Sequence, residues 1–298
     1  MNARRWAGES ATYLTYRLMS WLGRVLPTTS GRSAYQAAGR LFSRLAPGVR
    51  ATVAANQAQV LGRPVDDPLV QASTREAFAL YARYWFDTFN VLGWSDEQVR
   101  DTFRFDGIEH VEKGLAEGNG VVIALPHTGN WDVGGRAMGL RVAPVVSVAE
   151  HLTPERLFRL FLEHRRQLRM DIIDLASDHV GRQLTQRLEQ NRIVALVADR
   201  DLSGGGVEVE MFGRARRMPA GPALLALSTG APLLSGPTYT TRDGWVEVLS
   251  PVSIEPTGRR KQDVVALTQA LASAFERAIA AAPSDWHLFQ PGWDASTP

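Results

Sequence analysis

A histidine and an aspartate follow an apolar run in the segment Leu125-Pro-His-Thr-Gly-Asn-Trp-Asp132. The segment joins a predicted strand, 120–125, to a predicted helix near 130–139, and ligands of open α/β sheets bind at such carboxyl ends of strands. Asp132 could turn back to the imidazole of His127 and fix its tautomer, leaving the other ring nitrogen to take a proton from a hydroxyl. A helix-capping histidine, with Asp132 merely in the first helical turn, is an equally weighted alternative.

A second polar segment, Ala198-Asp-Arg-Asp-Leu-Ser203, ends the apolar run 192–198 and precedes three glycines. Two acids flank Arg200 where a buried strand opens into a loop. Asp199 could therefore orient His127, and the arginine could bind an anion. A self-contained salt bridge at the end of the strand is the alternative.

A third segment, Phe212-Gly-Arg-Ala-Arg-Arg-Met-Pro-Ala-Gly-Pro222, leads into an apolar helix predicted over 219–229. Arginines beside a helix N-terminus suit a phosphate or a developing oxyanion. The same arginines would also suit a solvated turn.

The elements that must position these segments follow from hydrophobic periodicity. The first hundred residues predict helices at 10–26, 33–46, 50–61 and 68–92, and no catalytic residue is expected there. From Phe103 onward, short apolar runs alternate with helical segments, which is typical of an α/β fold. Strands are predicted at 103–106, 120–125, 143–148, 170–174, 192–198, 207–212, 232–238 and 245–249. Helices are predicted near 108–117, 130–139, 154–168, 178–190, 219–229 and 262–281.

The predicted fold class is α/β, with a central mixed β-sheet flanked by helices and a helical N-terminal region. A chain of 298 residues with 45% hydrophobic content can bury a large core, and we expect one domain over 1–298 with its catalytic region at 103–294. No cysteine is present, which excludes thiol nucleophiles and thiolate metal sites.

The N-terminus predicts an amphipathic, basic helix within residues 1–26. Residues 1–50 contain eight arginines and one acid, and Arg17 and Arg24 flank an apolar stripe. An interfacial helix has this pattern, although a stripe that packs on the rest of the domain would share it. No signal peptide or membrane-spanning run is expected, so the prediction is a peripheral protein at the cytoplasmic face of the membrane. The stripe consists of Leu14, Leu18, Trp21, Leu22 and Val25.

Other functional classes lack their motifs. The sequence has no Gly-x-Ser-x-Gly elbow of a serine hydrolase. Its six histidines show no clustered zinc-ligand spacing, and neither nucleotide-binding glycine motif is present. An inert lipid-binding protein with a retained fold is the remaining alternative from a different class.

Taken together, these segments resemble the lysophospholipid-acyltransferase-like superfamily, whose mark is the His-x₄-Asp motif seen here at His127 and Asp132. Within it, the chain is similar to the actinobacterial phosphatidylinositol mannoside acyltransferases, relatives of the bacterial lipid A acyltransferases, over about residues 10–294. Further matching stretches are Val148-Ala-Glu150, Thr153-Pro-Glu155, Ala198-Asp-Arg-Asp-Leu202, Arg217-Met-Pro-Ala-Gly-Pro-Ala223, Thr229-Gly-Ala-Pro-Leu233 and Asp285-Trp-His-Leu-Phe-Gln-Pro-Gly-Trp293.

The resemblance implies a glycerolipid-acyltransferase-like fold and transfer of a fatty acyl chain, palmitoyl being expected, from acyl-CoA to a mannose hydroxyl of phosphatidylinositol mannoside. Acyl-CoA is then a cosubstrate, and no cofactor, metal or nucleic-acid partner is expected. Another glycolipid or a lysophospholipid is the alternative acceptor. The hydroxyl attacks the thioester directly, without an acyl-enzyme, and His127 matches the family's base.

The resemblance also assigns supporting residues. Well-known members carry a glutamate where this chain has Asp199, whose side chain is one methylene shorter, so Asp132 and Asp199 are both predicted as carboxylates that orient the base. Arg165 matches a family arginine near the cleft, and Glu150 lies in the stretch expected beside the acceptor. His151 stands where arginine is common. Arg200 and Arg217 complete the predicted substrate contacts.

Overall fold

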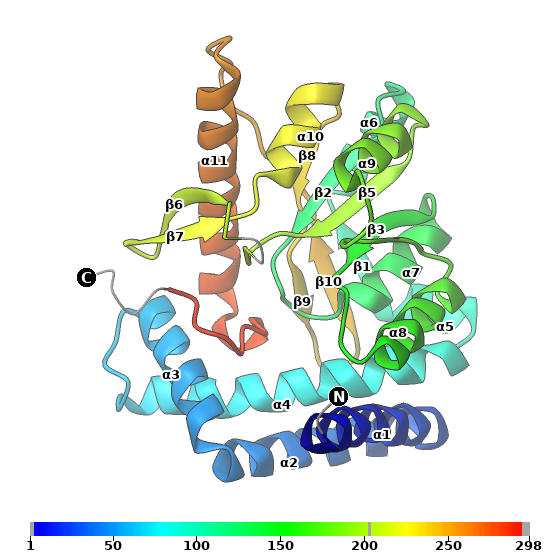
Figure 1. Cartoon of the computed structure of the whole chain (residues 1–298), viewed down its shortest axis with the longest axis vertical. Coiled ribbons are helices and arrows are strands. Elements are labelled where there is room, and N and C mark those ends of the chain that lie inside the picture. The colour runs from blue at the N-terminus through cyan, green and yellow to red at the C-terminus, as the bar shows by residue number, and fades with distance from the viewer. Residues whose placement is uncertain (1–2, 202–203, 294–298) are drawn as a thin grey trace.

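Four helices form a layer at the N-terminal side of the molecule (Figure 1). The structure is a computed structural model that describes residues 3–201 and 204–293, with only the backbone of residues 3–9 and 11. The predicted basic side chains of Arg4 and Arg5 lie outside this description, as do Leu202, Ser203 and Asp294. The layer comprises α1 (Ala3–Val25), α2 (Thr28–Leu45), α3 (Pro47–Leu61) and α4 (Pro68–Asn90).

Local sequence sets the ends of these helices, and glycine sets how closely they pack. Proline occupies the first turn of α3 and of α4, where a missing N–H costs nothing. The Asp67 side chain accepts a hydrogen bond from the Leu69 N–H and so caps α4. At Gly31 of α2, a Cβ atom would lie 2.2 Å from the Phe86 ring of α4. The close approach of α2 to α4 therefore requires glycine there.

The sheet has six strands in the order β11-β8-β2-β5-β3-β4, and the segments that carry His127 and Asp199 leave it at β2 and β5. Pairs within β8-β2-β5-β3-β4 are parallel, whereas β11 pairs antiparallel with β8, so the sheet is mixed as predicted. A separate three-stranded sheet has the order β1-β10-β9, and β6 pairs with β7 in a hairpin. The strands are β1 (Phe103–Asp106), β2 (Val121–Leu125), β3 (Val145–Ala149), β4 (Asp171–Asp174), β5 (Ile193–Val197), β6 (Val207–Met211), β7 (Arg214–Met218), β8 (Leu233–Ser235), β9 (Thr238–Thr240), β10 (Trp245–Val248) and β11 (Ser250–Pro251).

Helices cover both faces of the six-stranded sheet. Val122 of β2 shares one core with Leu271 and Phe275 of α11, whereas Ile123 faces a second core with Met138 of α7. This alternation follows from the two-residue period of a strand, and it confirms the predicted α/β class. The remaining helices are α5 (Asp96–Thr102), α6 (Ile108–Ala116), α7 (Trp131–Arg141), α8 (Glu155–Gln167), α9 (Val180–Glu189), α10 (Gly221–Thr229) and α11 (Arg260–Ala281), with short 3₁₀ turns at Val91–Gly93 and Pro283–Asp285.

Within the described residues, α11 is the one helix long and apolar enough, by length and composition, to cross a membrane. A core helix passes the same test, and Leu267, Leu271 and Phe275 of α11 are buried. We therefore treat α11 as part of the core.

The segment 212–222, which contains three arginines, was expected to lead directly into a helix. Its first part instead belongs to a hairpin formed by β6 and β7. Residues 212–213 connect β6 and β7 with φ angles of 54° and 71°, a left-handed pair typical of a two-residue hairpin turn. The sequence of β7 is Arg-Ala-Arg-Arg-Met, which has too few apolar residues for hydrophobic periodicity to predict a strand. The short helix α5 was also not predicted, although Ser95 and Gln98 form a capping box at its start.

Glu247 of β10 gives the fold a testable dependence on pH. Burial raises the pKa of this carboxyl to about 8 from an ordinary value of 4.5. The folded protein therefore keeps a proton that the unfolded chain releases, so the stabilisation present at low pH is lost as the pH rises from about 5 to 8. In Glu247→Gln, the free energy of unfolding relative to wild type should rise by up to about 1.4 kcal/mol per pH unit over this interval. Urea midpoints measured across it test the prediction, and a difference that is independent of pH contradicts it.

Candidate active site

The register of two parallel strands brings His127 and Asp199 together. Leu125 of β2 pairs with Val197 of β5, and the two site residues each lie two positions beyond this pair. Both segments therefore leave the same edge of the sheet side by side. The predicted placement of the histidine at the carboxyl end of a buried strand is confirmed.

The loop after β2 is shaped by close contacts. Gly129 has a φ of 58°, and a Cβ atom there would lie 2.6 Å from the Thr238 carbonyl oxygen, so only glycine fits. Asn130 then caps α7, because its side chain accepts a hydrogen bond from the Val133 N–H. These contacts hold His127 between the strand and the helix.

His127 is paired with Asp199. Its Nδ1 lies 2.5 Å from Asp199 Oδ1, and its backbone N–H donates to Asp199 Oδ2 at 3.1 Å. An ionised carboxylate only accepts hydrogen bonds, so Nδ1 carries a hydrogen, and in the neutral imidazole the lone pair is then on Nε2. The shorter aspartate side chain therefore reaches the imidazole, and the arrangement equips Nε2 to take a proton from a hydroxyl.

Asp199 is held as an anion at the end of β5. Burial alone would raise the pKa of this carboxyl. The charge of His127, hydrogen bonds from His127 and Trp286, and the charge of Arg216 outweigh that effect and hold the pKa well below its ordinary value. The Trp286 indole Nε1 donates to Oδ2 at 2.7 Å, and Arg216 Nη2 donates to the Asp199 backbone carbonyl at 2.5 Å.

The prediction that Asp132 orients the imidazole of His127 is wrong. Its Oδ1 accepts from Arg165 Nε at 2.7 Å, and its Oδ2 accepts from the Tyr84 hydroxyl at 2.8 Å. Burial would raise the pKa of Asp132, but the charge and hydrogen bonds of Arg165 lower it overall. The helical turn of α7 carries the carboxylate away from His127 and toward α8 and α4. Asp132 therefore positions the arginine rather than the histidine.

A groove of about 1230 Å³ opens beside His127 and contains most of the predicted substrate contacts. Glu150, Arg165 and Arg200 line it together with His127. Arg200 Nη2 lies 2.9 Å from Glu150 Oε2, and Nη1 donates to Gln290 Oε1 at 2.7 Å. The polar wall of the groove is thus formed by loops after β3 and β5 and by the C-terminal segment.

The rest of the groove is largely apolar. Val148, Leu184, Leu196 and Leu225 contribute to its lining, and aromatic rings of α4 and α8 line another part of it. Such a lining suits a long hydrocarbon chain, since apolar surface is favourably removed from water.

Arg217 lies outside this groove, contrary to prediction. It is exposed on β7, where its Nη1 donates to the Gly206 carbonyl at 3.1 Å. Successive side chains of a strand point to opposite faces, so it is the neighbouring Arg216 that turns inward and reaches Asp199. The Arg216 guanidinium packs over the rings of Trp286 and Trp293, 5.7 and 5.4 Å from their centroids.

Three further residues of the site were missed. Tyr84 comes from α4, within the first hundred residues, where no catalytic residue was expected. The backbone N–H of His287 donates to the His127 carbonyl at 2.7 Å, its Nε2 lies 3.0 Å from the Gly129 carbonyl oxygen, and burial lowers the pKa of His287 to about 3. Trp286 and His287 belong to a C-terminal stretch that resembles the family, and this resemblance was the signal that could have identified them. No sequence signal pointed to Tyr84.

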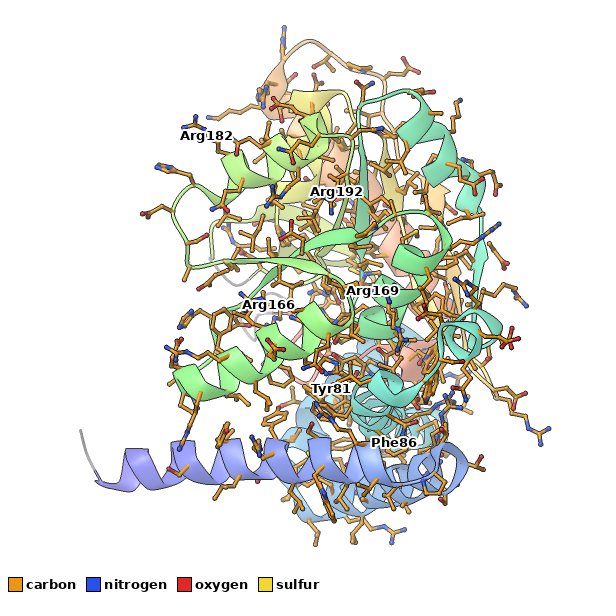
Figure 2. The ribbon with its side chains drawn as sticks, turned by 90° about the vertical axis from the view of Figure 1, so that its right-hand side faces the viewer. Tyr81, Phe86, Arg166, Arg169, Arg182 and Arg192 are labelled. Atoms are coloured by element: carbon orange, nitrogen blue, oxygen red, sulfur yellow. The ribbon has the colours of Figure 1, made fainter. Side chains whose placement is uncertain are left out.

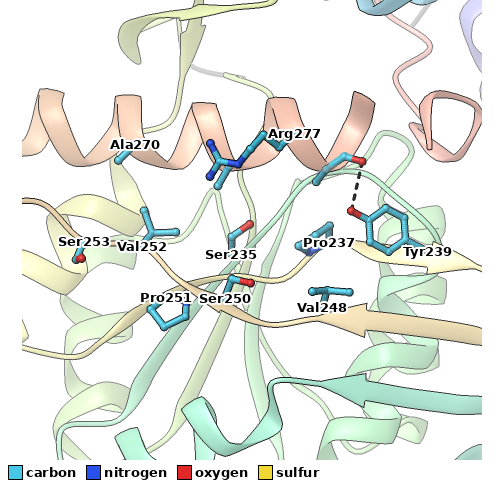
Figure 3. Close-up of a pocket in the computed structure, with 12 residues that line it drawn as sticks. Ser235, Pro237, Tyr239, Val248, Ser250, Pro251, Val252, Ser253, Ala270 and Arg277 are labelled. Carbon is cyan, nitrogen blue, oxygen red and sulfur yellow. Dashed lines mark hydrogen bonds between the residues drawn. The ribbon is translucent and has the colours of Figure 1, made fainter. Parts of the chain in front are cut away.

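A second cavity, of about 390 Å³, lies between α11 and the edge of the sheet (Figure 3). Ser235, Ser250 and Arg277 are among its lining residues, and Tyr239 beside them donates to the Ala278 carbonyl at 3.3 Å. None of the predicted site residues lines this cavity.

A histidine–carboxylate pair at the edge of an α/β sheet, beside a largely apolar groove, is suited to moving a proton next to a hydrocarbon chain, which is the chemistry of the acyltransferase class. The family model for bacterial lipid A biosynthesis acyltransferases matches residues 5–295, so the chain belongs to this family. Two similar proteins are the phosphatidylinositol mannoside acyltransferases of Mycolicibacterium smegmatis and Mycobacterium tuberculosis. The first is 38% identical over 97% of this chain and 93% of its own length, and the second is 39% identical over 92% and 86%.

Proposed function

We propose that this acyltransferase transfers a fatty acyl chain from acyl-CoA to a mannose hydroxyl of phosphatidylinositol mannoside. The observation that carries the proposal is the pairing of His127 Nδ1 with Asp199 Oδ1 at 2.5 Å on the wall of the apolar groove. The acceptor follows from the names of the two relatives, which match most of this chain.

The reaction requires one base and no acyl-enzyme intermediate. Nε2 of His127 takes the proton of the acceptor hydroxyl while the oxygen attacks the thioester carbonyl. The resulting tetrahedral intermediate collapses, the carbon–sulfur bond breaks, and the imidazolium returns its proton to the departing thiolate of CoA. Asp199 stabilises the imidazolium, as a buried carboxylate does in other acid–base sites.

The groove supports a division of the substrates by polarity. Arg200 of the polar wall and Arg165 of α8 both line the groove with His127, where a phosphate or the polar head of a glycolipid can accept hydrogen bonds from them. The acyl chain, palmitoyl being the proposed length, would lie against apolar residues such as Leu184 and Leu225.

The test is transfer of label from palmitoyl-CoA to purified phosphatidylinositol mannosides, with free CoA and acylated lipid followed separately. Wild-type protein should form both in equal amounts. Release of CoA without acylated lipid contradicts the proposed acceptor, and a parallel reaction with a lysophospholipid shows whether that alternative replaces it. Binding of the lipids without any CoA release would favour an inert lipid-binding protein.

The proposed acceptor is a lipid, and we propose that α1 holds the enzyme on the cytoplasmic face of the membrane as a peripheral protein. Of the predicted stripe, Leu14, Leu18, Trp21 and Val25 are each more than half exposed, whereas Leu22 is half-buried. The alternative that the stripe packs on the domain is therefore wrong: another face of α1, with Tyr13, Tyr16 and Met19, packs against the body of the protein. Leu41, Phe42 and Leu45 of α2 are also exposed.

Reversing the charges of Arg17 and Arg24 should weaken binding to anionic vesicles. Both side chains are exposed on α1, and each basic residue near an anionic surface contributes about 1 kcal/mol to binding. Cosedimentation of the Arg17→Glu/Arg24→Glu protein with vesicles containing phosphatidylserine measures the loss.

A matched control has the same change in net charge at the other end of the molecule. Figure 2 shows α1 along one end and Arg182 and Arg192 far from it. Arg182→Glu/Arg192→Glu should keep more of the vesicle binding than the α1 variant. Equal losses in the two variants would contradict a specific role of α1.

A further inference from the structure

The Asp199 carboxylate receives its hydrogen bonds from two elements that are far apart in sequence. Oδ1 pairs with His127 Nδ1 at 2.5 Å, whereas Oδ2 accepts from the Trp286 indole at 2.7 Å and from the His127 backbone N–H at 3.1 Å. Asp199 is fully buried, so its oxygens take their hydrogen bonds from protein donors rather than from bulk water. The two oxygens therefore bind different donor groups, and the indole makes the shorter of the two bonds to Oδ2.

The indole itself is held firmly. Trp286 is 1% exposed, and it forms an isolated antiparallel bridge with Thr128, the residue after His127. The neighbouring N–H of His287 donates to the His127 carbonyl at 2.7 Å. The C-terminal segment thus contacts both members of the histidine–aspartate pair.

The terminal torsion of an aspartate side chain is broad, so burial alone does not set the plane of the carboxylate. A donor fixed on Oδ2 restricts that rotation and leaves Oδ1 directed at His127 Nδ1. Rotation of the carboxylate would weaken the bond that sets the tautomer of the imidazole and the direction of its Nε2.

We infer that Trp286 is a positioning residue for acyl transfer, which acts on His127 through Asp199. This inference rests on the proposed function, because it gives Trp286 its role through the base of that reaction. The positioning effect comes from the hydrogen bond that the indole N–H donates to Asp199, rather than from the packing of the ring.

The experiment compares Trp286→Phe with Trp293→Phe. The two indoles are neighbours, with ring centroids 5.9 Å apart, but the Trp293 N–H donates to the Met211 carbonyl and not to Asp199. Trp286→Phe should lower kcat by about 10- to 100-fold with little change in KM, since small misplacements of a reacting group have effects of this size. Trp293→Phe should keep a kcat close to that of wild type. Equal kcat values in the two variants would overturn the inference.

A second readout needs no substrate. The proton shared by His127 Nδ1 and Asp199 should give a far-downfield signal in the NMR spectrum, assigned by its loss in His127→Ala. This signal should shift or broaden in Trp286→Phe and stay in place in Trp293→Phe. If His127→Ala remains active, the proposed function fails, yet this spectrum still decides whether Trp286 positions Asp199.

A second variant at position 286 keeps the inference testable if Trp286→Phe does not fold. Benzothienylalanine at position 286 keeps the bicyclic ring and replaces the indole N–H with sulfur. Should Trp286→Phe fail to fold, this variant takes its place in both measurements. A wild-type kcat and an unshifted signal in the benzothienylalanine protein would overturn the inference.

Discussion

Replacing His127 with alanine is expected to lower kcat for acyl transfer by about 10²–10⁴, the usual contribution of a positioned general base. The variant keeps the groove but loses the nitrogen that takes the hydroxyl proton in the proposed reaction. The imidazole lines the groove, and its side chain is 22% exposed, so its removal leaves only a modest cavity in the core. Rates of acylated-lipid formation at saturating palmitoyl-CoA measure the effect.

His110→Ala is the matched control for this variant. His110 lies on α6 and does not line the groove, so its loss should leave kcat near the wild-type value. Equal rates of lipid acylation by wild type and His127→Ala would remove His127 from the mechanism. A loss of activity in both variants would point to a general effect of the substitutions.

Replacing Asp132 with alanine is expected to lower the free energy of unfolding by about 1–3 kcal/mol, because it leaves the half-buried guanidinium of Arg165 without its partner. Asp132 is 2% exposed and pairs with Arg165 at 2.7 Å, while Tyr84 loses the acceptor for its hydroxyl. Urea unfolding followed by tryptophan fluorescence measures the change. Arg165 outweighs burial and lowers the pKa of Asp132 below its ordinary value of 3.8, so the ionised carboxylate stabilises the folded protein at pH values above 3.8. The difference in the free energy of unfolding between wild type and Asp132→Ala should therefore become smaller as the pH falls below 3.8.

Two further variants test whether the loss of stability in Asp132→Ala comes from the broken ion pair with Arg165 rather than from any loss of an aspartate. Asp106→Ala breaks an exposed pair with Arg104 and should leave the urea midpoint almost unchanged. The double variant Asp132→Ala/Arg165→Met removes the orphaned charge, so it should be more stable than Asp132→Ala alone. A double variant that is no more stable would contradict an ion-pair origin of the effect.

Local patterns in the sequence predicted the elements that build the edge of the sheet. The apolar runs that form β2 and β5 are followed at once by the polar segments around His127 and Asp199, which is a local property. Pro68 and Asp67 likewise mark the start of α4 through their own backbone preferences. Strands with few apolar residues, such as β7, escaped prediction because side-chain pattern was their only signal.

The choice of partners was not available from such patterns. Asp132 and Asp199 both suited His127 by residue type, and the decision depended on the register of β2 with β5 and on the direction of α7. The same holds for Tyr84 and Trp286, which reach the site from opposite ends of the chain. Contacts between residues so far apart depend on how the layers pack, which no local spacing encodes.

The sequence by itself therefore determined the residue types of the site, the strand ends that carry them, and the apolar stripe of α1. Tertiary structure alone decided that Asp199 pairs with the histidine, that Asp132 holds Arg165, and that Arg216 rather than Arg217 turns inward. Backbone preferences and the hydrophobic period act over a few residues, whereas hydrogen-bond partners are selected only when distant segments are buried against one another.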